Sequence, residues 1–289
     1  MAHGPGHIAI IGVGLLGGSV GLAAKAADER VRVTGIGRRE ASLRQALEAG
    51  AIDVGTLDVA QGVAEADLVV LASPLEAYRE QLAALRPALR RGATVTDVGS
   101  TKAQVVRLAE RVLGAGGPFV DSHPMAGSER RGVEFARADL FRNATCIVTP
   151  TPRTPPARVR LVERFWQSLG AVTVRLSPAE HDRAVARASH LPHVLAAALV
   201  RLQHDDELDL AGGGLLDTTR VASGDPAMWR EILLTNRSAV LSGLARTGRE
   251  IDHLAKLLER GDARRLEEYL AQAKSRRDAI IARRMRRGE

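Results

Sequence analysis

Residues 7–39 read HIAIIGVGLLGGSVGLAAKAADERVRVTGIGRR. The run Ile8–Ile11 is apolar and has the length of a strand, glycines follow it, and residues 18–27 are small and favour a helix. A second apolar stretch begins at Val31. This order of strand, glycine turn, helix and strand predicts the first unit of an α/β fold with a doubly wound, mostly parallel sheet.

The glycines in the turn have the spacing Gly12-x-Gly14-x-x-Gly17. In a dinucleotide site the first glycine permits the tight turn, the second lets the backbone approach a pyrophosphate, and the third lets the helix pack closely. The phosphates then lie at the free N–H groups of the helix N-terminus. A turn that is rich in glycine only for packing is the alternative. We predict that the whole turn binds a dinucleotide: Gly12, Val13, Gly14, Leu15, Leu16 and Gly17.

The residues after the second strand indicate which dinucleotide binds. An NAD-specific site usually carries Asp or Glu about 20 residues beyond the glycines, where it accepts hydrogen bonds from the ribose 2′-OH. This chain has Gly37, Arg38 and Arg39 there. A carboxylate would repel a 2′-phosphate, whereas two guanidinium groups can bind it through charge-assisted hydrogen bonds. We therefore predict NADP, with NAD as the alternative if both arginines are simply solvated.

Composition places the chain among ordinary globular proteins. It has 289 residues, of which 45% are hydrophobic and 26% charged, which is enough for two domains with cores of their own. The single cysteine, Cys146, lies in an apolar run and is expected to be a buried structural thiol. We expect no membrane span and no signal peptide, and hence a cytoplasmic protein.

The net charge of +7 raises the question of a nucleic-acid partner. The excess is scattered arginine, and its one dense group, residues 283–287, ends the last helix, where cations complement the helix dipole. Aromatic residues that could stack on bases make up only 3% of the chain. An anionic small-molecule substrate explains the positive charge better than nucleic acid does.

Apolar runs and helical stretches keep alternating after the first two strands. The runs are Leu68–Ala72, Ala93–Val98, Phe119–Ser122, Thr145–Val148 and Ala171–Leu176. The helical stretches between them include Leu75–Leu85, Lys102–Leu113 and Arg158–Leu169. From residue 177 no strand pattern recurs, so we divide the chain into a dinucleotide-binding domain, residues 1–176, and a helical substrate and dimerisation domain, residues 177–289.

The helical domain opens with a capping box, in which Ser177 is the N-cap and Glu180 the third helical residue. Helices are expected over Pro178–Leu202, over Pro226–Arg260 with Asp225 as N-cap, and from Ala263 onward. The last two helices carry more apolar positions at helical spacing than a helix pair can bury. A homodimer through this domain would cover them, although packing within the domain is the alternative.

Polar residues that follow strands are the candidates for chemistry, because ligands of such sheets bind beyond the carboxyl ends of the strands. Ser73 and Pro74 follow one strand and are expected to contact the cofactor, and residues 99–102 follow the next. His123 follows a third. It can face a nicotinamide and accept a proton while hydride leaves, or it can be a capping histidine that is bonded to loop backbone.

The helical domain adds further polar groups. Pro192 should kink the first helix between His190 and His193. These histidines are either site residues or a satisfied core pair, and metal binding is not expected, since no Asp, Glu or Cys has helpful spacing. Arg220 follows a glycine-rich loop and suits recognition of a carboxylate, unless it is paired with Asp217.

Six segments together resemble the prephenate/arogenate dehydrogenase family, in its order and over nearly the whole chain. They are GVGLLGGS (12–19), DVGSTK (97–102), SHPMAGSERRG (122–132), SHLPH (189–193), GGGLLDTTRVASGDPAMWREI (212–232) and Asn236. The resemblance implies a Rossmann-type domain joined to a helical domain that forms a homodimer. It also implies the oxidative decarboxylation of a cyclohexadienol that bears a ring carboxylate.

The resemblance assigns roles by motif. His123 matches the catalytic histidine that binds the ring hydroxyl, and Ser100 matches the serine that supports it. The residues matched to the substrate pocket are Ser189, His193 and Arg220, with Glu129, Asp217 and Trp229 around them. Leu216 departs from the family pattern, since some members have a lysine there that is thought to reach the neighbouring subunit's site.

We expect prephenate as the substrate, because His193 offers a hydrogen-bond donor where the oxygens of a keto acid would lie. Arogenate, which carries an amino group instead, is the alternative. A β-hydroxyacid dehydrogenase has a similar two-domain build but needs a lysine early in the helical domain, and none occurs between Lys102 and Lys256. A non-catalytic NADP-binding module would have no need of His123, His193 and Arg220 together.

Overall fold

The fold is that of a computed structural model, which describes residues 4–127 and 130–287. In this part of the chain five strands form one parallel sheet, in the order β3-β2-β1-β4-β5. They are β1 (His7–Ile11), β2 (Arg32–Ile36), β3 (Val54–Thr56), β4 (Leu68–Leu71) and β5 (Thr94–Asp97). The order reverses between β1 and β4, which is where a doubly wound sheet binds its ligand.

Helices cover both faces of this sheet. They are α1 (Leu15–Ala27), α2 (Glu40–Glu48), α3 (Val59–Val63), α4 (Tyr78–Leu85) and α5 (Ala103–Leu113), with a short turn η1 (Leu75–Ala77) before α4. Strand β1 shows why the sheet is buried on both sides. Ile8 and Ile10 pack with α1 and α2, whereas Ala9 and Ile11 pack with α3, α4 and α5. The expectation of an α/β fold is confirmed.

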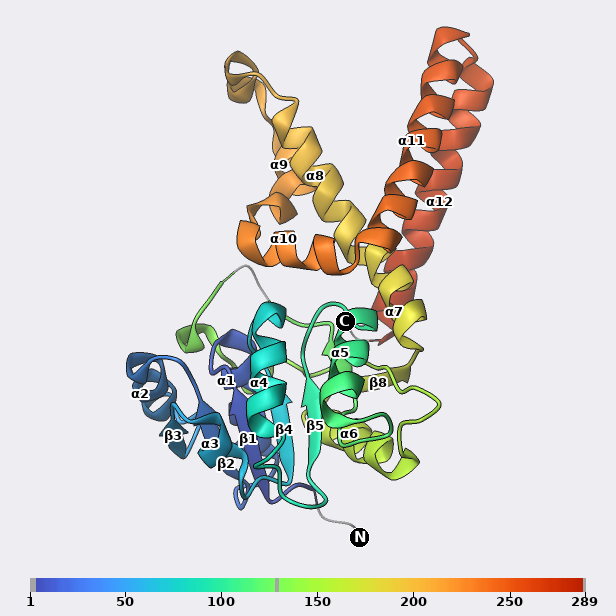
Figure 1. Ribbon diagram of the computed structural model, residues 1–289. Helices are drawn as coiled ribbons and strands as arrows, with labels where there is room; N and C mark the ends of the chain where they lie inside the picture. The colour runs from blue at the N-terminus through green and yellow to red at the C-terminus, as the bar shows by residue number, and fades with distance from the viewer. Residues whose placement is uncertain (1–3, 128–129, 288–289) are drawn as a thin grey trace.

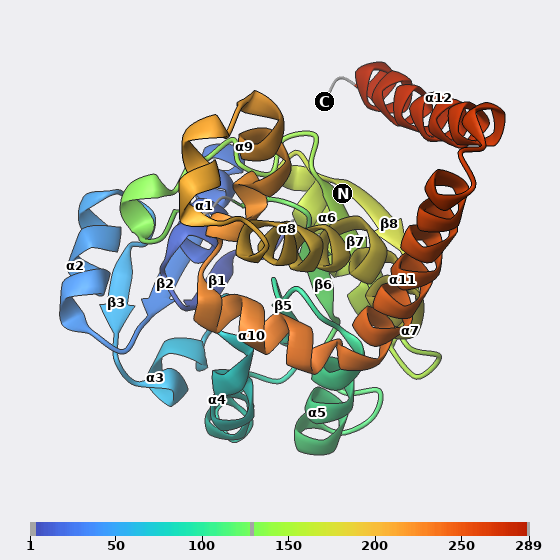
Figure 2. The same cartoon turned by 90° about the horizontal axis from the view of Figure 1, so that it is seen from above.

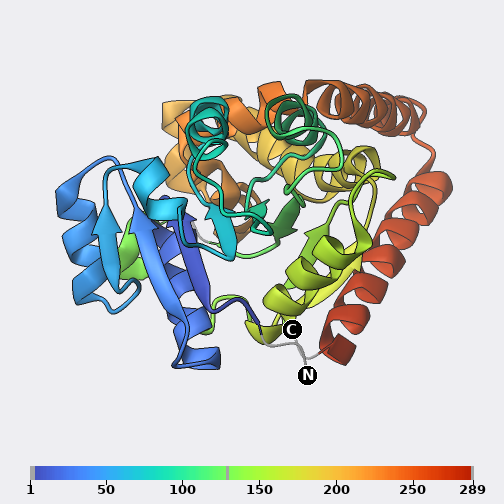
Figure 3. The ribbon, with the colours of Figure 1, turned by 60° about the horizontal axis from the view of Figure 1, so that its bottom comes forward.

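A second, shorter sheet follows. It contains β6 (Ser122–Pro124), β7 (Thr145–Val148) and β8 (Val172–Arg175), with β6 antiparallel to β7, and α6 (Pro156–Ser168) packs against it (Figure 3). The predicted strand Phe119–Ser122 is wrong in its bounds, because only a single bridge joins Phe119 to Val95 of β5. The ladder ends there because the N–H of Ser122 donates to the Asp97 side chain at 3.0 Å instead of to a strand carbonyl.

The rest of the described chain is helical. Its elements are α7 (Pro178–Val185), the π-helical turn η3 (Ala186–His190), α8 (Leu191–Arg201), η4 (Asp205–Leu210), α9 (Gly213–Thr219), η5 (Arg220–Ser223), α10 (Pro226–Thr235), α11 (Arg237–Glu259) and α12 (Ala263–Arg287). Helix α10 lies across the top of the first domain, while the α11–α12 hairpin and the arm of α8 and α9 project away from it (Figures 1 and 2).

Two helices differ from the expectation. The predicted helix Pro226–Arg260 is interrupted at Asn236, whose backbone leaves the helical conformation with φ −108° and ψ 26°. No glycine or proline marks this break. The expected kink at Pro192 takes the form of a π turn just before it, in which the N–H of Leu191 donates to the carbonyl of Ala186. The helix therefore continues past the proline with one wider turn.

The predicted caps are confirmed. The Ser177 hydroxyl accepts a hydrogen bond from the N–H of Glu180, whose carboxylate accepts one from the N–H of Ser177. The Asp225 side chain accepts from the N–H of Met228 at 2.7 Å. Cys146 is buried, as expected.

The helical domain leaves apolar side chains in solvent. Leu216, Leu234, Ile251, Leu258, Leu270 and Ile280 are each at least 55% exposed. A single chain therefore does not cover these helix faces. Within residues 4–127 and 130–287, no helix has the length and apolar character that crossing a membrane requires.

Candidate active site

The glycine turn between β1 and α1 has the geometry that a dinucleotide needs. Gly12 has φ 100°, and a Cβ there would lie 2.7 Å from the carbonyl oxygen of Ala72. A Cβ on Gly17 would lie 1.9 Å from the carbonyl oxygen of Gly12, so close packing excludes a side chain. Gly14 is the N-cap of α1, and a Cβ there would meet nothing within 4 Å. That open space beside a helix N-terminus fits a pyrophosphate.

The other residues of the turn differ in how deeply their side chains are buried. Val13 is only 4% exposed and packs in the core, so its backbone is all that it can offer a ligand. Leu15 and Leu16 begin α1 and are half-buried, and Leu16 packs against the core. The contribution of the turn to binding therefore comes mainly from N–H groups and from space, rather than from side chains.

The predicted cofactor residues lie on both sides of β1. Arg38 and Arg39 follow β2, both are exposed, and within the described chain neither has an ion-pair partner. Arg39 is the N-cap of α2. Ser73 and Pro74 follow β4, where the Ser73 hydroxyl donates to Gln81 at 2.7 Å. Both pairs thus lie at the carboxyl edge of the sheet, next to the glycine turn.

His123 lies in β6, opposite Ile147 of β7, and is 8% exposed. Its Nδ1 is 2.8 Å from Nε2 of His181. Burial, followed by the charges of His181 and Lys102, lowers the pKa of His123 well below its ordinary value of 6.5. A neutral imidazole can accept a proton, so the environment of His123 suits a general base.

His181 and Asp182 extend this contact into the helical domain. His181 is fully buried in α7, and its Nδ1 is 2.9 Å from Oδ1 of Asp182. The Asp182 carboxylate also accepts the backbone N–H of Lys102 at 2.8 Å and of Ala103 at 2.9 Å. It therefore caps the N-terminus of α5 from the other domain. Sequence reasoning missed both residues, because neither lies at a strand end or in a glycine-rich loop.

Lys102 ends the motif DVGSTK, and the sequence predicts no role for it. Its ammonium group is fully buried and lies 2.7 Å from Asp97, 2.6 Å from Asp121 and 2.7 Å from the carbonyl oxygen of Ser122. Burial opposes its charge, but Asp121 and Asp97 outweigh burial and raise the pKa of Lys102. The sequence did contain a signal for a role of Lys102, because the chain has only four lysines and this one follows a predicted strand.

Ser100 lies in the loop that follows β5. It is half-buried. On one side of it the N–H of Gly99 donates to Asp97 at 2.9 Å, and on the other Thr101 contacts Thr235 of α10 at 3.0 Å. The loop is thus fixed to both domains, with the Ser100 side chain between two anchored neighbours.

His193 and Trp229 form a stacked pair in the helical domain, with ring centroids 3.6 Å apart and an angle of 7° between the rings. Nδ1 of His193 is 2.8 Å from the carbonyl oxygen of Val221 and must donate to it, because a carbonyl only accepts. Burial lowers the pKa of His193, so its free Nε2 is an acceptor. The expectation that His193 offers a donor to a keto acid is therefore wrong.

His190 links this pair to His123. It is 1% exposed, contacts Trp229 edge-on, and accepts a hydrogen bond at Nδ1 from Asn236 at 3.2 Å. Burial lowers the pKa of His190 to about 4. A positive charge on His190 would lower the pKa of His123 further. The structure thus brings His123, His190 and His193 into one neighbourhood, in which the imidazoles are neutral.

The remaining predicted residues surround this neighbourhood or lie outside the described chain. Ser189 is half-buried in the π turn next to His190. Arg220 is exposed, precedes Val221, and has no ion-pair partner within the described chain, so the predicted alternative of a pair with Asp217 is not seen. Asp217 and Leu216 are exposed on α9. Glu129 lies outside the described residues.

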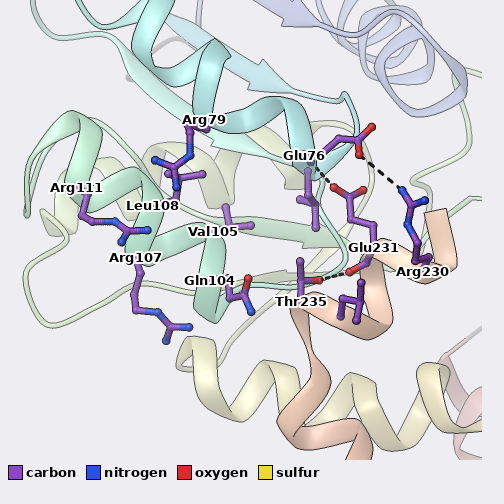
Figure 4. Close-up of a pocket in the computed structure, with 12 residues that line it drawn as sticks. Glu76, Arg79, Gln104, Val105, Arg107, Leu108, Arg111, Arg230, Glu231 and Thr235 are labelled. Atoms are coloured by element: carbon purple, nitrogen blue, oxygen red, sulfur yellow. Dashed lines mark hydrogen bonds and ion pairs between the residues drawn. The ribbon is translucent and has the colours of Figure 1, made fainter. Parts of the chain in front are cut away.

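A separate groove of about 530 Å³ lies where α10 meets α4 and α5 (Figure 4). Its walls come from both domains, and they are joined by a hydrogen bond from the N–H of Glu76 to the Glu231 carboxylate. The basic residues that line it are Arg79, Arg107, Arg111 and Arg230. No predicted site residue lines this groove.

Known proteins match the chain over most of its length. The family described as "Prephenate dehydrogenase, nucleotide-binding domain" matches residues 20–175, and "Prephenate dehydrogenase, dimerization domain" matches residues 177–272. The prephenate dehydrogenase of Bacillus subtilis is 39% identical over 94% of this chain and 76% of its own.

Solved structures give the same result. A crystal structure of prephenate dehydrogenase from A. aeolicus, in complex with hydroxyphenyl propionate and NAD+, is 34% identical, has a TM-score of 0.89, and is matched over 97% of this chain and 99% of its own. Synechocystis arogenate dehydrogenase is 29% identical with a TM-score of 0.84, over 95% of this chain and 99% of its own.

Proposed function

The chain belongs to the prephenate dehydrogenase family, and from this premise we propose that it converts prephenate to 4-hydroxyphenylpyruvate by oxidative decarboxylation in tyrosine biosynthesis. The observation that carries the proposal is His123, a buried neutral imidazole in β6 whose Nδ1 lies 2.8 Å from His181 of the helical domain. Membership in this family decides against a β-hydroxyacid dehydrogenase.

His123 accepts the proton of the C4 hydroxyl of prephenate, and Ser100 supports the same hydroxyl. A bound nicotinamide supplies the acceptor for the hydride that leaves C4. The ring carboxylate then leaves as CO2, and its bonding electrons restore the aromatic ring. The protein contributes orientation, charge complementarity and an environment in which the base is neutral.

Arg220 binds a substrate carboxylate, supported by its exposure and by its lack of an ion-pair partner in the described chain. Ser189 and His193 line the substrate pocket. The stacked ring of Trp229 fixes the plane of the His193 imidazole, and Asp217 and Glu129 belong to the surroundings of the site.

Arogenate is the second candidate substrate, and a specific observation favours it. Nε2 of His193 is an acceptor, which suits the amino group of arogenate better than the keto group of prephenate. The similarity to the B. subtilis enzyme supports prephenate as the first candidate.

The cofactor is a nicotinamide dinucleotide, bound at the glycine turn with Ser73 and Pro74 on the β4 side. We propose a preference for NADP over NAD, supported by the exposed guanidinium groups of Arg38 and Arg39 after β2. The A. aeolicus relative is bound with NAD+, so the preference is a property to be measured on this chain.

We also propose that residues 1–176 form the dinucleotide-binding domain and residues 177–289 the helical domain, through which two copies form a homodimer. The apolar helix faces that a single chain leaves exposed support the dimer.

The test is turnover by the purified protein, followed by the absorbance of reduced nicotinamide, with prephenate or arogenate and with NADP or NAD. The proposal expects the highest kcat/KM with prephenate and NADP. A higher kcat/KM with arogenate would favour the second candidate, and no turnover with either substrate would leave a non-catalytic binding module.

A further inference from the structure

The contacts of Asp182 fix the direction of a chain of hydrogen bonds that ends at His123. Asp182 faces two backbone N–H groups, those of Lys102 and Ala103, and its pKa is lowered despite burial by His181 and by these donors. It is thus an ionised carboxylate that only accepts. Nδ1 of His181, 2.9 Å from Asp182 Oδ1, must therefore carry a hydrogen.

His181 in turn fixes the direction of the hydrogen bond to His123. A neutral His181 that carries its hydrogen on Nδ1 has an unprotonated Nε2, which can only accept. Nδ1 of His123 lies 2.8 Å from that Nε2 and must be the donor. Nε2 of His123 is then left without a hydrogen. It is the atom at which a proton from substrate can be taken up.

We propose that His181 is a positioning residue, which holds His123 in the Nδ1–H tautomer and takes over that proton when Nε2 of His123 accepts one. The direction of transfer rests on the proposed function. The substrate O–H bond breaks as the Nε2–H bond of His123 forms, and the Nδ1–H bond of His123 breaks as the Nε2–H bond of His181 forms. His123 ends neutral, and His181 ends as an imidazolium beside Asp182.

The charges around the two rings favour this final distribution. A positive charge on His123 would face the Lys102 ammonium, His181 and His190, with no carboxylate among the contacts of its ring in the described chain. A positive charge on His181 also faces Lys102, but it gains Asp182 at 2.9 Å and the attraction of Asp97. The carboxylate next to His181 therefore makes it the better final carrier of the charge.

A metal site is the other use that nearby histidines and a carboxylate suggest. Across residues 4–127 and 130–287, no group of three or more His, Cys, Asp or Glu side chains is arranged to hold a metal ion. His123, His181 and Asp182 instead bond to one another in sequence.

The tautomer is tested on the wild-type protein by ¹⁵N NMR of histidine-labelled enzyme, with a His123→Asn variant to assign the signals. The proposal expects His123 to be protonated at Nδ1 and unprotonated at Nε2. Protonation at Nε2 alone would overturn it. This measurement needs no turnover, so its result is independent of whether the proposed function is correct.

The transfer is tested with His181→Gln, which keeps a hydrogen-bonding group but cannot carry the proton. Single-turnover rates should fall by about 10- to 100-fold, with KM for prephenate within about twofold of wild type. Single-turnover rates are also measured in H2O–D2O mixtures. Plotted against the D2O fraction, they should follow a curve in wild type, where two protons move, and a straight line in the variant, where only one moves. His253→Gln, at an exposed position on α11, is the matched control and should match wild type.

Two results would overturn the role of His181. One is a single-turnover rate of His181→Gln within about twofold of wild type, and the other is the same curvature in both proteins. Should His181→Gln not fold, two measurements on the wild-type chain still decide: the NMR measurement tests the tautomer, and a linear dependence of the wild-type rate on the D2O fraction would overturn the transfer.

Discussion

The buried histidines predict how stability depends on pH. Among the described side chains, those of His123, His181, His190 and His193 are each no more than 8% exposed. Burial is the largest cause that lowers the pKa of each below 6.5. Below pH 6.5 the unfolded chain therefore binds more protons than the folded one, and the free energy of unfolding falls as the pH falls.

The pKa of His190 is about 4, so its contribution to the free energy of unfolding is lost between pH 6.5 and about pH 4. The loss amounts to about 3 kcal/mol. Urea unfolding at a series of pH values measures it. His190→Asn should flatten the lower part of the curve, whereas the exposed control His253→Asn should leave its shape unchanged. A stability that stayed constant from pH 7 to pH 4 would show that these histidines titrate normally.

Arg220 tests the binding side of the site. Replacing Arg220 with Ala should remove a charge-assisted contact of about 1.5–3 kcal/mol, which appears mainly as a raised KM for prephenate. Arg201→Ala, at an exposed position on α8, is the matched control. An unchanged KM in a correctly folded Arg220→Ala protein would mean that Arg220 does not bind substrate.

At the scale of single residues, the sequence predicted the groups that belong to readable patterns. His123 follows an apolar run, and Gly12 and Gly17 have the spacing of a nucleotide turn. His181 carries no such pattern, because its importance comes from a contact between two domains. Which nitrogen of His193 carries its hydrogen could not be predicted from the sequence either. It depends on the carbonyl of Val221, which is 28 residues away.

At the scale of elements, the end of β2 carries the prediction about the cofactor. With both guanidinium groups on the 2′-phosphate, NADP should be preferred to NAD by about 10- to 1000-fold in kcat/KM, after the cost of desolvation. Replacing Gly37 with Asp and Arg38 with Ser should reverse the order.

The structure allows this double change. A Cβ on Gly37 would lie 3.2 Å from Cδ2 of Leu43, the end of a side chain that can shift by a few tenths of an ångström. The measurement is kcat/KM for both cofactors at saturating prephenate, with Arg44→Ser on α2 as the control for a lost arginine. Equal use of NAD and NADP by the wild-type protein would mean that Arg38 and Arg39 point to solvent.

The break between α10 and α11 carries a second prediction. The Asn236 amide donates to the carbonyl of Asp182 at 2.8 Å and to Nδ1 of His190 at 3.2 Å, and Asn236 is 5% exposed. Asn236→Leu leaves Nδ1 of His190 without a donor and removes one of the two hydrogen bonds to the carbonyl of Asp182, which also accepts the N–H of Ala186. The change should lower the free energy of unfolding by about 1–3 kcal/mol. Urea unfolding measures the loss, with Gln203→Leu as the control. A loss no greater than that of the control would contradict the role of Asn236.

Elements with local signals were predictable, and those decided by distant contacts were not. The capping box at Ser177 is a local pattern and is confirmed. The end of the pairing with β5 goes with a hydrogen bond from the N–H of Ser122 to Asp97, and the break at Asn236 goes with a hydrogen bond to Asp182. Neither partner is near in sequence, so periodicity alone could not place these two features.

At the scale of the whole molecule, the candidate site lies where the two domains meet. Asp182 of α7 caps α5, Thr235 of α10 contacts Thr101, and Arg131 forms an ion pair with Asp225 at the start of α10. The change from alternating elements to helices was readable near residue 176, because the hydrophobic period changes there. The packing of the helices onto the sheet edge was not, since it depends on these polar contacts.

His123 is the proposed base in the oxidation of prephenate. The measurement that tests it most directly is kcat with prephenate and NADP for wild type and His123→Asn, together with the Kd of the cofactor. We predict that kcat falls by about 10²- to 10⁴-fold while the Kd stays nearly unchanged. A folded His123→Asn protein that retained more than half of the wild-type kcat would contradict it.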